Sequence, residues 1–237
     1  MDALILAGGL GTRLAPVVSS RAKSVAPVAG RPFLGHLLDH LARSREIRRA
    51  ILCVGHLADT VEASLGPRHG RLALAYSREE APLGTGGALR HAIRGFGLAA
   101  PVLALNGDCY FGLHVDSLLA FHRRTRPLAT IAVLRVPDCA RYGAVRLAGP
   151  RVAAFEEKGG TGPAWVSAGW YVLSGPALAR LRTMPRAFSL ERESLSAWGA
   201  AGVLGAYRSR ARFIDIGTPE DYERAGRIVP ARRRGAR

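Results

Sequence analysis

Short apolar runs alternate with helix-like segments through the first half of the chain. The runs resemble buried strands and lie at residues 3–7, 50–54, 72–76 and 102–105. Apolar residues recur at helical spacing at residues 33–43, 58–65 and 86–94. This alternation predicts a mostly parallel sheet with helices on both faces, because parallel neighbours need a crossover between them. We therefore expect an α/β fold with a Rossmann-like, doubly wound core.

The second half differs, because its strand-like runs follow one another closely. These runs lie at residues 129–136, 142–147, 151–157, 166–173 and 203–207. Helices are expected at residues 116–124, 176–182, 190–198 and 219–228. We find no repeat and no linker in the sequence, so we expect a single domain over residues 1–230. In it, the second half adds a small β region at the edge of the sheet and carries part of a cleft.

The chain has a formal net charge of +16, and the arginines that cause it are scattered along the sequence. One local excess lies at the end, which finishes Arg-Arg-Arg-Gly-Ala-Arg. We expect residues 231–237 to be a disordered basic tail in solvent. The scattered charge argues against nucleic acid as a partner, since nucleic-acid-binding domains gather their basic residues on one face.

Two further features concern the setting of the protein. No apolar run approaches the roughly 20 residues of a membrane-spanning helix, and no basic region precedes the first apolar stretch as in a signal peptide. The three cysteines, Cys53, Cys109 and Cys139, are far apart and lack metal-ligand spacing. We expect reduced thiols, a cytoplasmic location and no membrane partner.

A glycine-rich loop directly follows the first expected strand, in the sequence Leu6-Ala7-Gly8-Gly9-Leu10-Gly11-Thr12-Arg13-Leu14. Glycines let the backbone turn tightly and bring its N–H groups against phosphate oxygens. A dinucleotide fingerprint would need glycine at Leu14, and a Walker A loop would need a lysine where Thr12 stands. Arg13 and Lys23 add two cations beside the loop. The pattern predicts a site for a triphosphate whose leaving group is pyrophosphate.

Lysine is almost absent: of the 34 basic residues, only Lys23 and Lys158 are lysines. A compact ammonium is a point charge that a planar guanidinium does not replace at a tight phosphate site. Either Lys23 and Lys158 were therefore kept to bind phosphate, or a few lysines simply remain by chance in an arginine-rich chain. Composition does not decide between these two explanations.

Two aspartates are expected at strand ends. Asp108, in Asn106-Gly107-Asp108, follows the expected strand at 102–105, at the edge where open α/β sheets bind ligands. Asp215 ends another strand-like run, just before a helix start at Thr218. Carboxylates in such places suit Mg²⁺, a hard ion that takes oxygen ligands and bridges phosphate oxygens. A capping or turn role is the structural alternative for Asp215.

The glycine-rich loop and the segment at residues 22–32 resemble the signature of the sugar nucleotidyltransferase family. The resemblance continues through residues 82–89, 105–108, 155–158 and 213–222, and so covers nearly the whole chain to about residue 228. Ala22 departs from the family, which usually has proline before the lysine.

This resemblance implies a GT-A-like nucleotidyltransferase fold and three groups of site residues. Asp108 and Asp215 would bind Mg²⁺ and, with Arg13 and Lys23, would be the catalytic residues. The nucleotide would be bound by Leu6, Ala7, Gly8, Gly9, Gly11, Thr12, Arg13, Lys23, Glu80, Gly84, Thr85, Asn106 and Asp108. The sugar phosphate would be bound in the small β region by Gly143, Glu157, Lys158 and Ser167. Ser167 stands where relatives commonly have asparagine, so its reach toward the sugar is shorter.

The implied reaction joins a nucleoside triphosphate to a sugar 1-phosphate and releases pyrophosphate. The chain looks most like the guanylyltransferases of D-glycero-D-manno-heptose 1-phosphate, which implies GTP as the nucleotide. Glu79 or Glu80 could accept the adjacent N1–H and N2–H donors of guanine. The alternatives are a mannose-1-phosphate guanylyltransferase, an N-acetylmuramate 1-phosphate uridylyltransferase and an inactive regulator that senses nucleotide sugars. Assembly as a homo-oligomer is left open.

Overall fold

The computed structural model describes residues 1–9, 22–155 and 160–230. Its strands are β1 (Asp2–Leu6), β2 (Pro27–Val28), β3 (Arg31–Pro32), β4 (Arg49–Val54), β5 (Arg68–His69), β6 (Leu72–Arg78), β7 (Val102–Asn106), β8 (Cys109–Phe111), β9 (Ala129–Val136), β10 (Val145–Ala148), β11 (Arg151–Phe155), β12 (Ala164–Leu173), β13 (Leu204–Arg208) and β14 (Phe213–Asp215). Its α-helices are α1 (Phe33–Leu41), α2 (Ala58–Leu65), α3 (Gly84–Gly95), α4 (Val115–Thr125), α5 (Gly175–Thr183), α6 (Ser196–Ala200) and α7 (Pro219–Ile228). A 3-10 helix spans Lys23–Val25 and a π-helix spans Leu190–Leu195.

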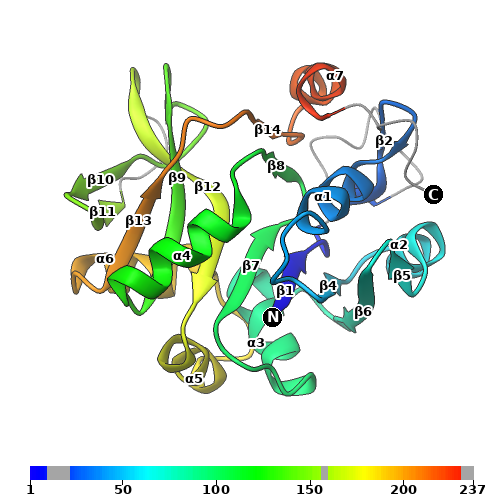
Figure 1. Cartoon of the computed structure of the whole chain (residues 1–237), viewed down its shortest axis with the longest axis horizontal. Helices are drawn as coiled ribbons and strands as arrows, with labels where there is room; N and C mark the ends of the chain where they lie inside the picture. The colour runs from blue at the N-terminus through cyan, green and yellow to red at the C-terminus, as the bar shows by residue number, and fades with distance from the viewer. Residues whose placement is uncertain (10–21, 156–159, 231–237) are drawn as a thin grey trace.

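The first half of the chain forms the parallel part of a ten-stranded sheet (Figure 1). β1 lies between β4 and β7 and is parallel to both, and β6 continues the sheet parallel to β4. The four strands therefore end at the same edge, which is where ligands bind in open α/β sheets. The strand–helix alternation predicted from the sequence is confirmed in this half, and so is the α/β fold.

The second half extends the same sheet, with mixed strand directions. β12 runs antiparallel between β7 and β9, which carries the sheet across from one half of the chain to the other. β13 lies parallel to β9, and the antiparallel strands β11 and β10 finish that edge. Closely spaced strands pair antiparallel because short connections cannot cross over a sheet.

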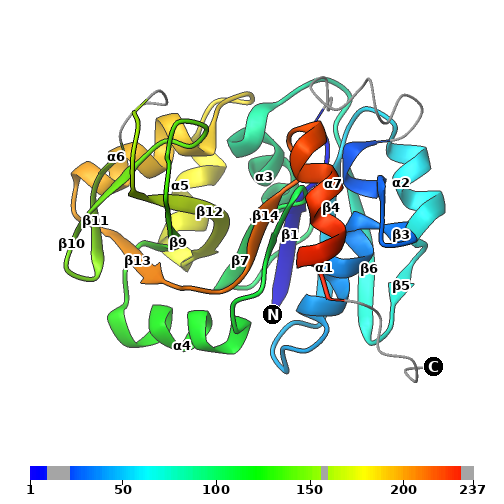
Figure 2. The same cartoon turned by 90° about the horizontal axis from the view of Figure 1, so that it is seen from above.

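Helices cover both faces of the sheet, so its strands are buried on both sides. In β1, Ala3 and Ile5 pack into one core cluster and Leu4 into the other, as the alternation of side chains in a strand requires. The first cluster includes Leu37 of α1, and the second includes Leu89 of α3. Figure 2 shows α1 and α4 on one face and α3, α5 and α6 on the other.

Three local features differ from expectation. The strand expected at 142–147 begins only at Val145, and the helix expected at 190–198 is a π-helix followed by the short α6. β8 and β14, both only three residues long, pair antiparallel in a small separate sheet. This pairing was not expected, and it sets Asp215 opposite Cys109.

Two expectations about the whole chain can be compared with the structure. Cys53, Cys109 and Cys139 are all buried free thiols. Among the described helices, none has the length and apolar character that crossing a membrane requires.

Candidate active site

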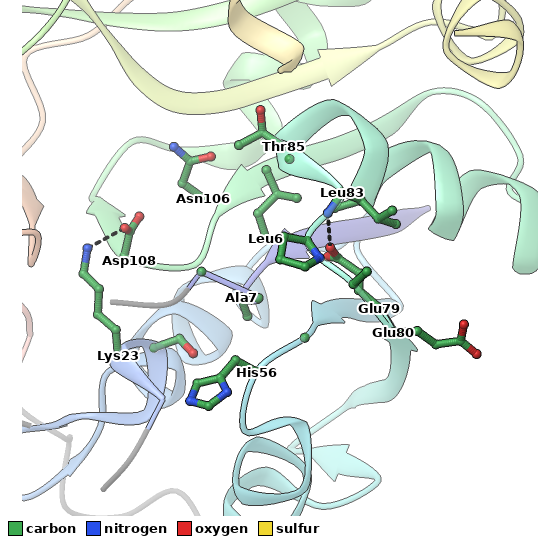
Figure 3. Close-up of a pocket in the computed structure, with 18 residues that line it drawn as sticks. Leu6, Ala7, Lys23, His56, Glu79, Glu80, Leu83, Thr85, Asn106 and Asp108 are labelled. Atoms are coloured by element: carbon green, nitrogen blue, oxygen red, sulfur yellow. Dashed lines mark hydrogen bonds and ion pairs between the residues drawn. The ribbon is translucent and has the colours of Figure 1, made fainter. Parts of the chain in front are cut away.

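A cavity of about 600 Å³ lies where the four parallel strands end (Figure 3). The segments after these strands supply most of its wall, together with Lys23 and Ser24. They contribute Leu6 to Gly9 from the end of β1 onward, Gly55 and His56 after β4, Glu79 to Thr85 after β6, and Asn106 and Asp108 at the end of β7. The cavity thus occupies the edge of the sheet that the sequence predicted.

Backbone hydrogen bonds hold these segments together. The amide of Gly107 donates to the carbonyl of Leu6 over 2.8 Å, and the amide of Ala7 donates to the carbonyl of Cys53 over 2.8 Å. The start of the glycine-rich loop is therefore fixed to both neighbouring strand ends. The peptide groups that follow β1 and β7 have little freedom before any ligand arrives.

Lys23 lies beside two carboxylates at one end of the cavity. Its Nζ is 2.6 Å from Asp108 Oδ2 and 3.8 Å from Asp215 Oδ1. The Lys23 side chain is only 12% exposed, so its charge is poorly solvated and depends on these partners. Burial and the neighbouring Asp108 carboxylate raise the pKa of Asp215, while Lys23 acts in the opposite direction. Two negative charges against one positive charge leave this corner with an excess of negative charge.

A divalent cation would relieve that excess. In the part of the chain that the structure describes, Asp108, Cys109 and Asp215 form a group whose potential ligand atoms lie within 4.8 Å of one another. Asp215 Oδ1 is buried without a hydrogen-bond partner, as expected of an oxygen suited to a cation. The Cys109 thiol instead donates to Asp108 Oδ1 over 3.3 Å, and burial raises its pKa. The two carboxylates therefore make an acidic site that fits a hard divalent ion.

Glu79 and Glu80 both border the cavity, but their carboxylates differ. Glu79 is half-buried, and its Oε2 accepts a hydrogen bond from the Leu83 amide over 3.2 Å. A Cβ on Gly8 would stand 3.2 Å from Glu79 Oε1, so this carboxylate lies against the glycine-rich loop. Burial raises the pKa of Glu79, and the Leu83 amide opposes that change. Glu80 is exposed, and in Figure 3 its carboxylate points away from the other labelled side chains.

The turn at Gly84 and Thr85 rests on a segment about a hundred residues further along the chain. Gly84 has a φ of +72°, and a Cβ there would stand 2.6 Å from the Phe188 carbonyl oxygen. Thr85 Oγ1 donates to Glu191 Oε2 over 2.6 Å and accepts from the Leu190 amide over 2.9 Å. The Tyr171 hydroxyl donates to Glu191 Oε1 over 3.1 Å. This part of the wall is therefore held from the π-helix and β12.

Gly143 and Ser167 lie outside the wall of this cavity. Ser167 is in β12, and its Oγ accepts from the Gly169 amide over 3.3 Å. Gly169 has a φ of +70°, and a Cβ there would stand 2.6 Å from Asn106 Nδ2. Ser167 is thus two residues from a direct contact with the cavity wall at Asn106.

The structure brings together most of the residues predicted for the nucleotide. Those that line the cavity are Leu6, Ala7, Gly8, Gly9, Lys23, Glu80, Gly84, Thr85, Asn106 and Asp108. Gly11, Thr12, Arg13, Glu157 and Lys158 lie outside the described residues. The sequence did not predict Ser24 and His56 in the wall, or Glu191 behind Thr85. No spacing in the chain could have indicated the last contact, since it joins two side chains 106 residues apart.

Comparison with known proteins identifies the family. The chain belongs to the nucleotidyl transferase family, whose model matches residues 2–231. It is 34% identical to D-glycero-alpha-D-manno-heptose 1-phosphate guanylyltransferase from Aneurinibacillus thermoaerophilus, over 95% of this chain and 96% of that protein. It is 36% identical to mannose-1-phosphate guanylyltransferase from Mycobacterium tuberculosis, over 94% of this chain but only 63% of that longer protein. The solved structure of HddC from Yersinia pseudotuberculosis complexed with GMP-PN superposes with a TM-score of 0.82 and 32% identity, covering 95% of this chain and 98% of that one.

Proposed function

We propose that the protein is a sugar-1-phosphate guanylyltransferase, which condenses GTP with a sugar 1-phosphate and releases pyrophosphate. The observation that carries the proposal is the placement of Lys23 and Asp108 in the wall of a cavity that also holds Glu79, with Asp215 beside Lys23. Cationic and metal-binding groups suit the phosphates at one end, and a fixed carboxylate suits the base. The two relatives named as guanylyltransferases, and the structure of HddC complexed with GMP-PN, support the same activity.

The metal is proposed to be Mg²⁺, held by Asp108 and Asp215. The buried Asp215 Oδ1, which has no hydrogen-bond partner, and the carboxylate oxygens that the pair offers support this choice. When bound, the ion would supply positive charge shared between phosphate oxygens. Cys109 takes no part in ligation in this proposal, because its thiol keeps its proton and donates a hydrogen bond to Asp108 Oδ1.

Lys23 is proposed to stabilise the departing pyrophosphate. Its ammonium is a compact charge with three donors, and it lies beside the acidic pair in the wall of the cavity. Arg13, Gly11 and Thr12, outside the described residues, are proposed to bind the same phosphates, with Gly8 and Gly9 at the start of the loop. The nucleophile is a phosphate oxygen of the sugar 1-phosphate, already anionic, so no strong base is needed. Positioning and charge stabilisation then supply most of the acceleration.

The guanine base is proposed to be recognised by Glu79. The sequence offers Glu79 and Glu80 as candidate acceptors, and the fixed orientation of Glu79 against Gly8 and Leu83 supports Glu79. A carboxylate can accept the adjacent N1–H and N2–H donors of guanine, whereas uracil offers one donor between two acceptors. Asn106 also lines the cavity, and its buried Oδ1 has no hydrogen-bond partner, which supports a contact with the nucleotide.

The acceptor is proposed to bind beside Asn106, toward Gly143 and Ser167. Glu157 and Lys158, outside the described residues, complete this proposed sub-site. We expect D-glycero-D-manno-heptose 1-phosphate as the sugar phosphate, with mannose 1-phosphate as the second candidate, following the two relatives above.

A panel of sugar 1-phosphates tests the acceptor, with GTP held constant and pyrophosphate release as the readout. We expect the heptose phosphate to give the highest kcat/KM, with mannose 1-phosphate lower. Faster turnover of N-acetylmuramate 1-phosphate would refute the choice of acceptor. No pyrophosphate from any sugar phosphate would favour the alternative of an inactive regulator.

A further inference from the structure

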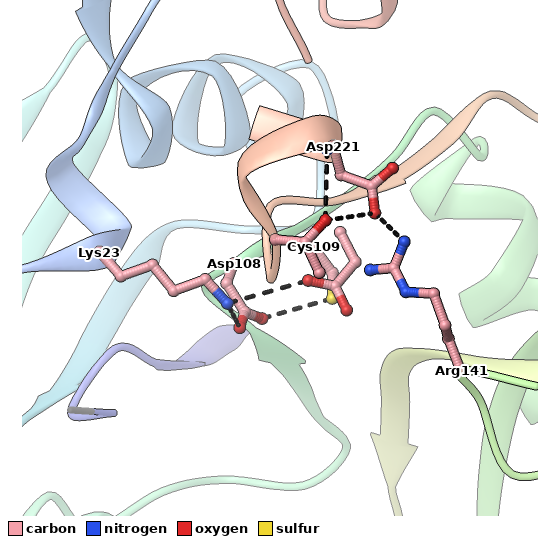
Figure 4. A network of polar contacts seen from close by, with 7 residues as sticks. Lys23, Asp108, Cys109, Arg141 and Asp221 are labelled. Carbon is pink, nitrogen blue, oxygen red and sulfur yellow. Dashed lines mark hydrogen bonds and ion pairs between the residues drawn. The ribbon is translucent and has the colours of Figure 1, made fainter. Parts of the chain in front are cut away.

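An ion pair joins two segments that lie far apart in the sequence and meet beside the acidic site (Figure 4). Arg141 lies in the connection between β9 and β10, directly before Tyr142 and Gly143. Asp221 lies in the first turn of α7. The two residues are 80 positions apart, and Arg141 Nη1 donates to Asp221 Oδ2.

Asp221 is only 4% exposed, so its carboxylate depends on the partners that surround it. Thr218 Oγ1 donates to Asp221 Oδ2 over 3.4 Å, and the Asp221 amide donates back to Thr218 Oγ1 over 3.3 Å. Arg224, one turn along α7, donates to Asp221 Oδ1 over 3.2 Å. Two arginines therefore share one buried carboxylate, and Arg141 reaches it from another part of the fold.

The Asp221 side of the contact leads directly to the acidic site. Thr218 caps α7, and only two residues separate it from Asp215 at the end of β14. The Ile216 amide donates to the Asp108 carbonyl over 3.0 Å, so this turn is also fixed to the other aspartate. A shift of the start of α7 would therefore be transmitted to the turn after Asp215.

The Arg141 side leads to the segment proposed for the sugar phosphate. The Arg141 guanidinium lies 5.8 Å from the centre of the Tyr142 ring, and the Tyr142 and Phe213 rings are 6.1 Å apart. The Tyr142 amide donates to the Cys139 carbonyl over 2.8 Å, which closes the turn that precedes Gly143. The segment is thus packed against β14 and held to α7 at the same point.

We propose that Arg141 and Asp221 are positioning residues that hold the turn at Tyr142 and Gly143 in register with Asp215. The inference rests on the proposed function for its consequence in catalysis, but the mechanical link stands on the contacts alone. An arginine suits this role because its planar fork fixes direction as well as distance. Loss of the link should loosen acceptor binding and leave the nucleotide cavity, whose wall contains neither Arg141 nor Asp221, unchanged.

Arg224 supplies a matched control, since it binds the same carboxylate but belongs to α7 itself. We expect Arg141→Ala to raise the KM for the sugar phosphate about tenfold with little change in the KM for GTP, because only uniform acceptor binding is weakened. Arg224→Ala should change neither constant by more than about twofold, because the exposed Arg224 guanidinium contacts Asp221 within one helix and holds no second segment. If the two variants behave alike, the carboxylate needs only neutralisation and the proposal is wrong.

Amide hydrogen exchange in the substrate-free protein separates this inference from the proposed function. Arg141→Ala should speed exchange at the Tyr142 and Ile216 amides about tenfold, since local opening becomes easier, while Arg224→Ala should leave both close to wild type. Unchanged exchange in Arg141→Ala would overturn the proposal even if the enzyme turns over as expected. Absence of turnover in the wild type would refute the function and leave the exchange result standing.

Further variants keep the test informative if Arg141→Ala does not fold. Arg141→Lys should raise the KM for the sugar phosphate much less than Arg141→Ala does, because the positive charge still reaches Asp221. Asp221→Asn and Arg141→Gln, which lacks the charge, should each reproduce the effect of losing Arg141. Combining the two changes should cost little more than Asp221→Asn alone, as expected for residues that act through one contact. Additive effects would contradict a shared role.

Discussion

Lys23 Nζ lies 2.6 Å from Asp108 Oδ2, although the two residues are 85 positions apart in the chain. The same ammonium is 3.8 Å from Asp215 Oδ1, so a single lysine lies beside both proposed metal ligands. Lys23 thus neutralises part of the charge that a divalent ion would neutralise. The lysine and the ion should therefore compete for the two carboxylates until a triphosphate draws the lysine away.

Lys23→Met should strengthen the binding of Mn²⁺, used as a probe for Mg²⁺, to the nucleotide-free protein. Removing the competing positive charge should lower the dissociation constant about fivefold or more, given the strength of charge interactions at this separation. The free-Mn²⁺ signal in electron paramagnetic resonance measures the effect. Lys23→Arg keeps the charge and is the control, which should show no such gain. Weaker Mn²⁺ binding in Lys23→Met would contradict the competition.

Asp215→Asn should abolish turnover without destabilising the protein. We expect kcat to fall at least about a hundredfold, the usual cost of losing a group that stabilises charge in the transition state. The melting temperature measured without metal should stay the same or rise, because the carboxylate is buried beside Asp108. Wild-type rates with Mg²⁺ still required would contradict the assignment of Asp215.

Glu79→Gln should remove the preference for guanine over hypoxanthine. Hypoxanthine lacks the 2-amino donor, so a buried acceptor is left unpaired when ITP binds. The wild type should therefore have a kcat/KM for ITP at least about tenfold lower than for GTP. The amide of the variant presents one acceptor in place of a charged pair, and its GTP and ITP rates should converge. Glu80→Gln makes the same change at the exposed neighbour and should keep the wild-type ratio. A loss of selectivity in Glu80→Gln alone would assign the base to the other glutamate.

Two buried histidines should make the protein less stable in mild acid. Burial lowers the pKa of both His40 and His122 to about 4, from 6.5 in the unfolded chain. Between these pH values the unfolded state binds protons that the folded state does not, so stability is lost as the pH falls from 6.5 toward 4. Each histidine should contribute up to about 1.4 kcal/mol per pH unit to that slope.

Urea unfolding at several pH values between 7 and 4.5 measures this slope. His122→Gln cannot take up a proton, and so its free energy of unfolding should fall less steeply than that of the wild type. His122 Nδ1 lies 2.8 Å from Thr130 Oγ1, so the variant will also lose stability at pH 7, and the slope is the quantity to compare. Equal slopes in the two proteins would show that His122 does not contribute.

The edge of the sheet that carries the site could be predicted, because polar residues and glycines directly after an apolar run show where a strand ends. Asn106-Gly107-Asp108 follows a continuous apolar run, and parallel strands bring such ends together with Leu6 and the glycines after it. The direction of β12 could not be predicted from the sequence, because an apolar run has the same pattern whether its neighbouring strands are parallel or antiparallel.

The contacts that support the site could not be predicted from the sequence. β8 and β14 are three residues long, too short for a periodic signal, yet they pair Asp215 with Cys109. The contacts of Thr85 with Glu191 and of Arg141 with Asp221 join side chains 106 and 80 residues apart. Such contacts depend on how the helices and strands pack together in the folded protein. The pattern of residue types along one sequence does not show that packing.

The choice of nucleotide tests the central claim most directly. Purified protein is given Mg²⁺, the heptose and mannose 1-phosphates, and in turn GTP, ATP, UTP, CTP and dTTP, and pyrophosphate release is followed with the nucleotide sugar identified by mass. We expect GTP to be preferred over UTP and dTTP by at least about a hundredfold in kcat/KM, because the wrong base leaves buried polar groups unpaired. Equal or faster turnover with ATP or UTP would contradict a guanylyltransferase.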